Sequence, residues 1–194
     1  MSTLATTNIK HPSAVNPAII LDSDGKATVA GMGLVHINTT AFSAVSTVSI
    51  NGCFSAAYDN YSFSLNLDSS AASQIGLRLR QSTTDTTSGY NYAQYFHNPS
   101  ATGVSGGSGL TYIRIGFTGS ANRSASLVDI LSPFLSSRTP VFAKNYTLAS
   151  GVGPQQEIIG AEQSGSTNSF DGLTVYPLSG TITGTIRVYG YKNS

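Results

Sequence analysis

The chain has 194 residues and a formal net charge of +1, and only 10% of its residues are charged, against about 25% in ordinary soluble domains. A near-zero net charge without clusters of Lys or Arg excludes nucleic-acid binding driven by phosphate neutralisation. Hydrophobic residues make up 40% of the chain, which excludes a disordered protein. The length suits one domain with a short appendage, and the low charge fits a protein that functions inside an assembly.

Residues 1–31 are predicted to form an extended arm ahead of that domain. Two apolar segments, 18–21 and 27–29, flank an Asp-Gly pair at 24–25 and predict a small hairpin. A two-stranded hairpin is marginal in water, so the arm needs a neighbouring surface. The candidate anchoring residues are the aliphatic side chains Ile9, Ile19, Ile20 and Leu21.

The sequence does not predict a calcium loop, a signal peptide or a membrane span. Residues 22–25 resemble a calcium loop, but the glycine comes two positions early and Gly33 stands where the bidentate acid belongs. The start of the chain lacks the charged and apolar regions of a signal peptide. No segment approaches the roughly 18 apolar residues of a membrane span, so we expect no membrane insertion.

Strict alternation of apolar and polar residues predicts strands at 61–67, 76–80, 112–117 and 181–189. In the second of these segments the alternation places Arg78 and Arg80 on the face exposed to water. Helical periodicity occurs once, at 127–135, where Pro133 and the alternation at 128–130 favour a strand that runs into a bend. Turn signals separate the segments, at 51–52, 59–60, 106–107, 171–172 and 179–180.

These patterns predict an all-β protein with eight to ten short strands. We expect residues 32–194 to form a jelly-roll-like β-sandwich head domain. Two segments rich in Ser, Thr and Gly, 82–89 and 97–109, are expected as loops on either side of an aromatic segment at 90–96.

The aromatic segment supplies the candidate receptor contacts Tyr90, Tyr92, Tyr95 and His97. Aromatic rings beside Asn and Gln side chains suit recognition of a sugar or a protein, because rings stack while amides form hydrogen bonds. The alternative is a strand that carries its tyrosines on the outer face or in a contact between subunits.

No motif predicts catalysis. Residues 103–107 fit the G-x-S-x-G nucleophile elbow, but a polar loop precedes them, a strand follows, and no histidine occurs after His97. Glu157 and Glu162 are the best candidates for a carboxylate pair, yet their spacing does not indicate a glycosidase. We therefore expect a protein that is not an enzyme.

Metal ligands and cofactor motifs are missing as well. His11, His36 and His97 lie far apart without ligand spacing. Cys53 is the single cysteine, so the chain has no internal disulfide and no cysteine-based zinc site, and its neighbours predict a buried thiol. We expect no metal and no cofactor.

Several segments resemble small virion proteins of tailed bacteriophages, described as tail fibre or minor tail proteins. The resemblance covers about residues 7–191 and is carried by TNIKHPS at 7–13, IILD at 19–22, VSINGCF at 48–54, YDNY at 58–61 and GTITGTIRVYGY at 180–191. It implies a homotrimer with an arm tied to other virion proteins and a β-rich head that points outward. It brings no catalytic residues.

The expected function is therefore that of a bacteriophage structural protein on the virion surface, assembled in the host cytoplasm. It would be a short trimeric tail fibre or receptor-binding head that is attached by its arm and recognises a bacterial surface glycan. The alternative is a capsid decoration protein at three-fold positions, which the lack of a shaft favours. A glycan-degrading spike enzyme is the third reading, and the missing acid cluster and missing β-helix repeats count against it.

Overall fold

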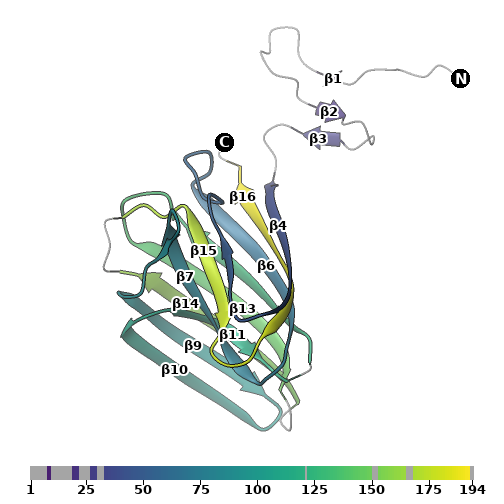
Figure 1. Cartoon of the computed structure of the whole chain (residues 1–194), viewed down its shortest axis with the longest axis vertical. Helices are drawn as coiled ribbons and strands as arrows, with labels where there is room; N and C mark the ends of the chain where they lie inside the picture. Colours follow the sequence, from purple (N-terminus) through teal and green to yellow (C-terminus); the bar gives the residue numbers. More distant parts are fainter. Residues whose placement is uncertain are drawn as a thin grey trace, which may run out of the picture.

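The computed structural model describes residues 8–9, 19–21, 27–29, 33–120, 122–149, 153–164 and 168–192. In this part of the chain all regular structure is β-strand, and the strands fall into three sheets (Figure 1). Two curled antiparallel sheets form a jelly-roll-like β-sandwich, so the predicted fold class is confirmed.

The larger sheet has eight strands in the order β10-β9-β14-β13-β12-β6-β16-β4. In chain order they are β4 (Leu34–Val45), β6 (Asn60–Ser69), β9 (Tyr90–Asn98), β10 (Ala101–Leu110), β12 (Ser124–Leu131), β13 (Thr139–Ala149), β14 (Gly153–Gln163) and β16 (Ile182–Tyr191).

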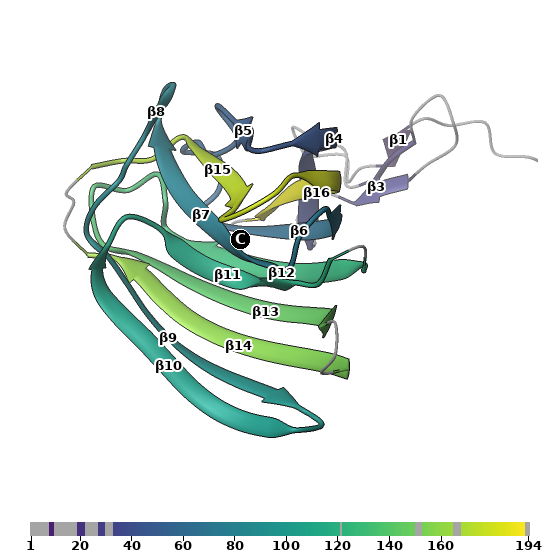
Figure 2. The ribbon, with the colours of Figure 1, turned by 60° about the horizontal axis from the view of Figure 1, so that its bottom comes forward.

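The smaller sheet has the order β11-β7-β15-β5, with a short strand, β8, beside β7. Its strands are β5 (Val48–Ile50), β7 (Ser73–Gln81), β8 (Thr84–Asp85), β11 (Ile113–Thr118) and β15 (Gly172–Pro177). Figure 2 shows the larger sheet curling round the smaller one.

The core lies between the two sheets and is built by the predicted alternation. Phe63, Leu65 and Leu67 of β6 point inward, and Leu77 and Leu79 of β7 meet them from the opposite sheet. The strands predicted at 61–67, 76–80, 112–117 and 181–189 all lie within observed strands or overlap them. The strand predicted to run into a bend is β12, which ends at Leu131 before a residue with positive φ, Ser132.

Two local predictions are wrong. Arg80 was expected on the wet face, but it is buried because β8 covers it and supplies Asp85 as its partner. Residues 97–109 were expected as a loop with a turn at 106–107, but most of them form β10. Glycine suits this strand because a Cβ at Gly103 would lie 2.5 Å from the Phe96 ring on β9.

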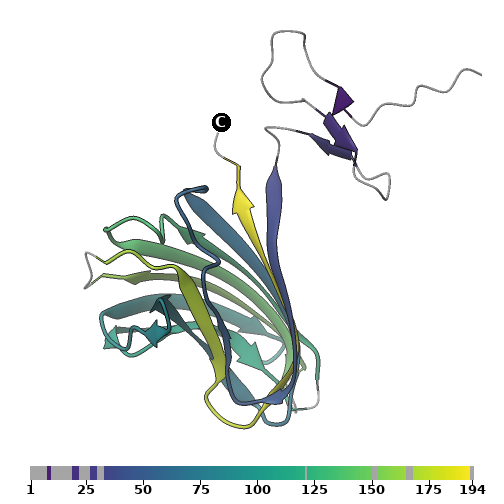
Figure 3. The same cartoon turned by 45° about the horizontal axis from the view of Figure 1, so that its top comes forward.

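The arm forms the third sheet, in the order β1-β2-β3, with β1 (Asn8–Ile9), β2 (Ile19–Leu21) and β3 (Ala27–Val29). The predicted pairing of 19–21 with 27–29 is confirmed, with Ile20 opposite Thr28, while the Asp-Gly pair at 24–25 lies outside the described residues. Figure 3 shows these strands apart from the sandwich, beyond the start of β4.

A glycine in β11 makes room for hydrogen bonds that link the two sheets. The β11–β7 register shifts between Arg114 and Gly116, and there the Phe117 amide donates to Oδ1 of Asn145 at 3.1 Å. Asn145 belongs to β13 of the larger sheet, and its amide group donates to the Ser124 and Ser126 hydroxyls on β12. A Cβ at Gly116 would lie 2.5 Å from Cγ of Asn145.

We therefore expect Gly116→Ala to lower the free energy of unfolding by about 2–3 kcal/mol, because the buried amide must move and weaken its hydrogen bonds. Gly160→Ala is the matched control, since no heavy atom lies within 4 Å of the added carbon. Urea denaturation of both variants measures the difference. Equal midpoints for the two variants would contradict the close packing described at Gly116.

Candidate functional site

The outward face of the larger sheet carries seven large apolar side chains that are 43–81% exposed. Each of them except Val104 follows a buried residue in the sequence, so alternation leaves these side chains in water. They lie on five adjacent strands, β12, β13, β14, β9 and β10. We call this surface the outer patch, and its members are Tyr95, Val104, Leu127, Phe142, Tyr146, Leu148 and Ile158.

Strand register makes the outer patch continuous. Lys144 lies between Leu127 and Ile158, and Ile158 lies opposite Tyr95, which in turn lies opposite Val104. These five residues form one row across the sheet. Directly opposite residues on neighbouring strands are close enough for their side chains to touch.

The protruding side chains leave shallow hollows between them. One hollow of about 290 Å³ is lined by Asp129, Phe142, Lys144 and Gly160, among others. A neighbouring hollow of about 420 Å³ is lined in part by Tyr146 and by residues of β6 and β14. Both have mainly apolar walls, so the surface suits apolar contact better than binding of a charged small molecule.

The sequence-predicted receptor contacts lie on two different faces. Tyr95 and His97 point outward, and His97 Nδ1 lies 2.8 Å from the Thr102 hydroxyl. Tyr90 is fully buried, and its hydroxyl accepts a hydrogen bond from the Leu79 amide at 2.9 Å.

Burial raises the pKa of Tyr90. Tyr92 is partly buried and packs against the core. The spacing of three residues between Tyr92 and Tyr95 already places them on opposite faces of a strand. The four residues therefore do not form one contact surface.

The structure brings the four anchor candidates together in the arm sheet. Ile9 of β1 lies opposite Ile19 of β2, and Ile20 and Leu21 continue the same strand. Ile19 is half-buried. Its described strands pair with one another, and none of them pairs with a strand of the sandwich.

A buried ion pair joins the two sheets on their inner side. Arg114 of β11 contacts Glu157 of β14, whose side chain is completely buried, and Gln155 Nε2 donates to Glu157 Oε1 at 2.8 Å. Glu162, the other candidate acid, points outward and lies 3.4 Å from Arg138. The two carboxylates therefore face opposite sides of the sheet and do not form the pair that a glycosidase needs.

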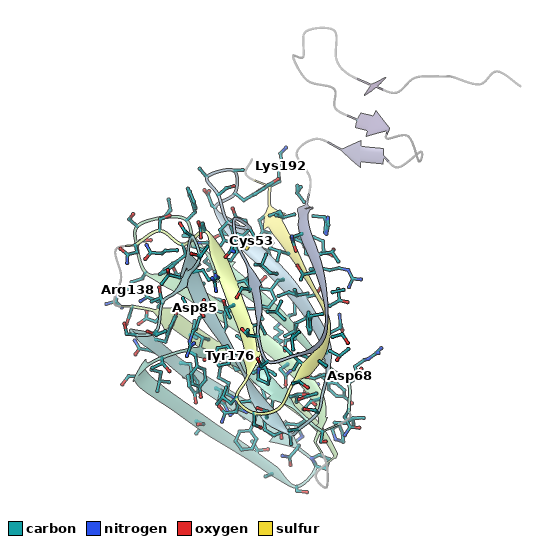
Figure 4. All side chains as sticks on the ribbon, viewed as in Figure 1. Cys53, Asp68, Asp85, Arg138, Tyr176 and Lys192 are labelled. Atoms are coloured by element: carbon teal, nitrogen blue, oxygen red, sulfur yellow. The ribbon has the colours of Figure 1, made fainter. Side chains whose placement is uncertain are left out.

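A second polar cluster lies on the smaller sheet, and no local sequence pattern indicates it. Arg80 donates to Asp85 of β8 and to the hydroxyl groups of Ser49 and Thr174. The Arg78 guanidinium lies 4.7 Å from the ring centre of Tyr176. Figure 4 labels Asp85 and Tyr176, which come from β8 and β15. The cluster is internally satisfied and holds β8 against β7.

The remaining chemical candidates are accounted for by the fold. Residues 103–107 lie inside β10, so they form no nucleophile elbow. His36 bonds the Thr39 hydroxyl, and His11 lies outside the described residues. Within the described ranges no three His, Cys, Asp or Glu side chains are placed to hold a metal ion. In that same part of the chain, no helix is long and apolar enough to cross a membrane.

Comparisons with known proteins give no family. No family model and no curated protein matches the chain. Among solved structures, a galectin from Caenorhabditis elegans is 10% identical with a TM-score of 0.33, and the match covers 83% of this chain and all of the galectin.

Two longer enzymes also match in part. A sucrose-6-phosphate hydrolase from Lactobacillus gasseri is 16% identical with a TM-score of 0.31, over 78% of this chain and 29% of the hydrolase. A β-fructofuranosidase from Schwanniomyces occidentalis is 6% identical with a TM-score of 0.26, over 96% of this chain and 38% of that enzyme. Similarities this low carry no argument about function.

We expect removal of one partner of the buried ion pair to be costly. Glu157→Gln should lower the free energy of unfolding by about 3–5 kcal/mol, because it leaves Arg114 buried and uncompensated. The double variant Arg114→Met, Glu157→Leu should recover most of that loss. Arg138→Met, at the exposed pair, is the control and should cost less than about 1 kcal/mol. Urea denaturation of all four chains tests this, and a double variant no more stable than Glu157→Gln would contradict it.

Burial raises the pKa of the Cys53 thiol to about 12. The thiolate fraction at pH 8 is then about one part in ten thousand, and the thiolate is the reactive form. We expect an aromatic disulfide reagent to modify native protein at least about a thousand-fold more slowly than urea-unfolded protein. Rapid stoichiometric release of the coloured thiolate from native protein would disprove the burial.

Proposed function

We propose that this protein is a structural component of a bacteriophage particle, with a sandwich head on the particle surface and an arm that attaches it. The single observation that carries the proposal is the arm sheet, whose described strands pair with one another and not with the sandwich. The sequence resemblance over about residues 7–191 supplies the class of protein and the expectation of a homotrimer.

The physical argument concerns the size of the arm sheet. Its three strands contain two, three and three residues, far fewer than a sheet needs for independent stability. Burial of Ile19, Ile20 and Leu21 on another protein would contribute roughly 1.5–3 kcal/mol each as an upper estimate. Another virion protein or a neighbouring copy of the arm can supply that surface.

Two locations on the particle fit the proposal. A tail fibre head would point toward the host and contact a surface glycan. A capsid decoration protein would occupy three-fold positions. The described residues contain neither a helical shaft nor a repeated β segment, and this observation favours decoration. Electron microscopy of particles that carry a tagged chain distinguishes few copies at the tail from many copies over the head.

The arm is tested with Ile19→Asp, Ile20→Asp in the full chain. Successive residues of a strand point to opposite faces, so the double change places a charge on both faces of β2. We expect the number of copies per purified particle to fall at least about ten-fold, because the lost apolar burial exceeds 1.4 kcal/mol. Quantitative mass spectrometry of particles provides the measurement.

The matched control is Leu178→Asp, which changes an exposed leucine of the sandwich between β15 and β16. It should leave the number of copies unchanged. A chain that starts at Gly33 retains every sandwich strand, so we expect it to fold and to be missing from particles. Normal occupancy by that chain or by the double variant would refute the proposed attachment.

A further inference from the structure

We propose that the outer patch is the surface through which copies of this chain bind one another. The inference deepens the proposed function, on which it rests for its biological setting, by naming a two-fold contact between copies that is separate from the three-fold contact of the expected homotrimer. It also gives Tyr95 and His97, on the same face, a place at a subunit contact in place of a receptor contact.

The first argument is the size of the surface. Five strands about 4.8 Å apart, each contributing about eight residues at about 3.3 Å, give this part of the sheet a face of about 600 Å² in projection, polar residues included. Each partner in a stable complex buries roughly 800 Å², and the side chains roughen the patch beyond its projected area. The largest apolar patch of a typical monomer is about 300–600 Å² and is often functional.

The second argument is the composition of the outer patch. Tyr95, Phe142 and Tyr146 are aromatic, and the central row contains one charge, on Lys144. The buried centres of protein interfaces are rich in aromatic residues and poor in charge. The hollow between Phe142 and Ile158 has mainly apolar walls, with Asp129 and Lys144 as its charged residues, whereas glycan sites need a set of converging polar groups.

The charges of the outer patch favour a second copy of this chain as the partner. Lys144 lies opposite Leu127, and Asp129 lies opposite Phe142, so the two charges are diagonal neighbours on β12 and β13. Both line the same hollow. Five ion pairs join described side chains, and none of them includes either residue.

A surface that carries one unpaired cation and one anion is complementary to itself. When a second copy approaches with the same face, Lys144 of each chain meets Asp129 of the other, and symmetry repeats the contact. Gly160 leaves the space beside Phe142 open, so an apolar side chain of the partner can enter it. An unrelated partner would not need both charges on one face.

The apolar part of the interface is tested with Phe142→Ser, Ile158→Thr in the full chain. We expect the dissociation constant for self-association to rise at least about 30-fold, as for loss of a central interface side chain. Analytical ultracentrifugation gives the constant, and thermal unfolding verifies the fold. Leu135→Ser, Leu178→Thr is the matched control, because both leucines are about as exposed but lie outside the patch.

The paired charges are tested by charge reversal and mixing. Lys144→Asp alone and Asp129→Lys alone should each weaken self-association, because each places like charges across the interface. A mixture of the two variants restores opposite charges and should form mixed oligomers, detected by native mass spectrometry. Tyr191→Phe is the control, since it removes the 2.8 Å hydrogen bond to Asp129 without changing charge.

The interface would be established if the patch variants weaken self-association and if the mixture of the two charge variants restores it. A monomeric native chain at micromolar concentration, or association unaffected by the patch variants, would overturn it. Mixing that fails to restore association would overturn the face-to-face arrangement. Normal particle occupancy of the arm variants, with self-association intact, would refute the proposed function and leave this inference standing.

Discussion

The two sheets of the sandwich are held in one relative position by polar contacts that cross its interior. Apolar packing between sheets is not directional, so it alone fixes their separation better than their alignment. Arg114 and Glu157 join β11 to β14, and Asn145 joins the backbone of β11 to β13 and β12. Both contacts involve β11. The irregular register of this strand at Gly116 brings its backbone against the side-chain amide of Asn145.

The smaller sheet packs against only part of the larger sheet. Four principal strands of the smaller sheet face eight strands of the larger one, and β10 stays exposed or half-buried on both faces. Its outer side carries aromatic and aliphatic residues where an isolated sandwich would carry polar ones. The unbalanced face and the self-paired arm sheet have one feature in common, because in the described residues neither is covered by another sheet of the chain.

The fold was predictable where one face of a strand is polar. The segment 61–67 and the arm pairing follow from alternation and turn residues. The outer patch could not be recognised from the sequence because β13 carries apolar side chains on both faces. Val141 and Ala143 point inward, and Phe142 and Tyr146 point outward. Period-two analysis needs a polar face to detect a strand. The burial of Arg80 depends on β8, two residues that no local pattern distinguishes from a loop.

The position of the last strand has a consequence for biosynthesis. In the described residues, β4 is the first strand of the sandwich, yet its backbone pairs only with β16, the last described strand. The edge of the larger sheet can therefore close only after β16 has been synthesised. The nascent arm therefore emerges long before its own head is complete.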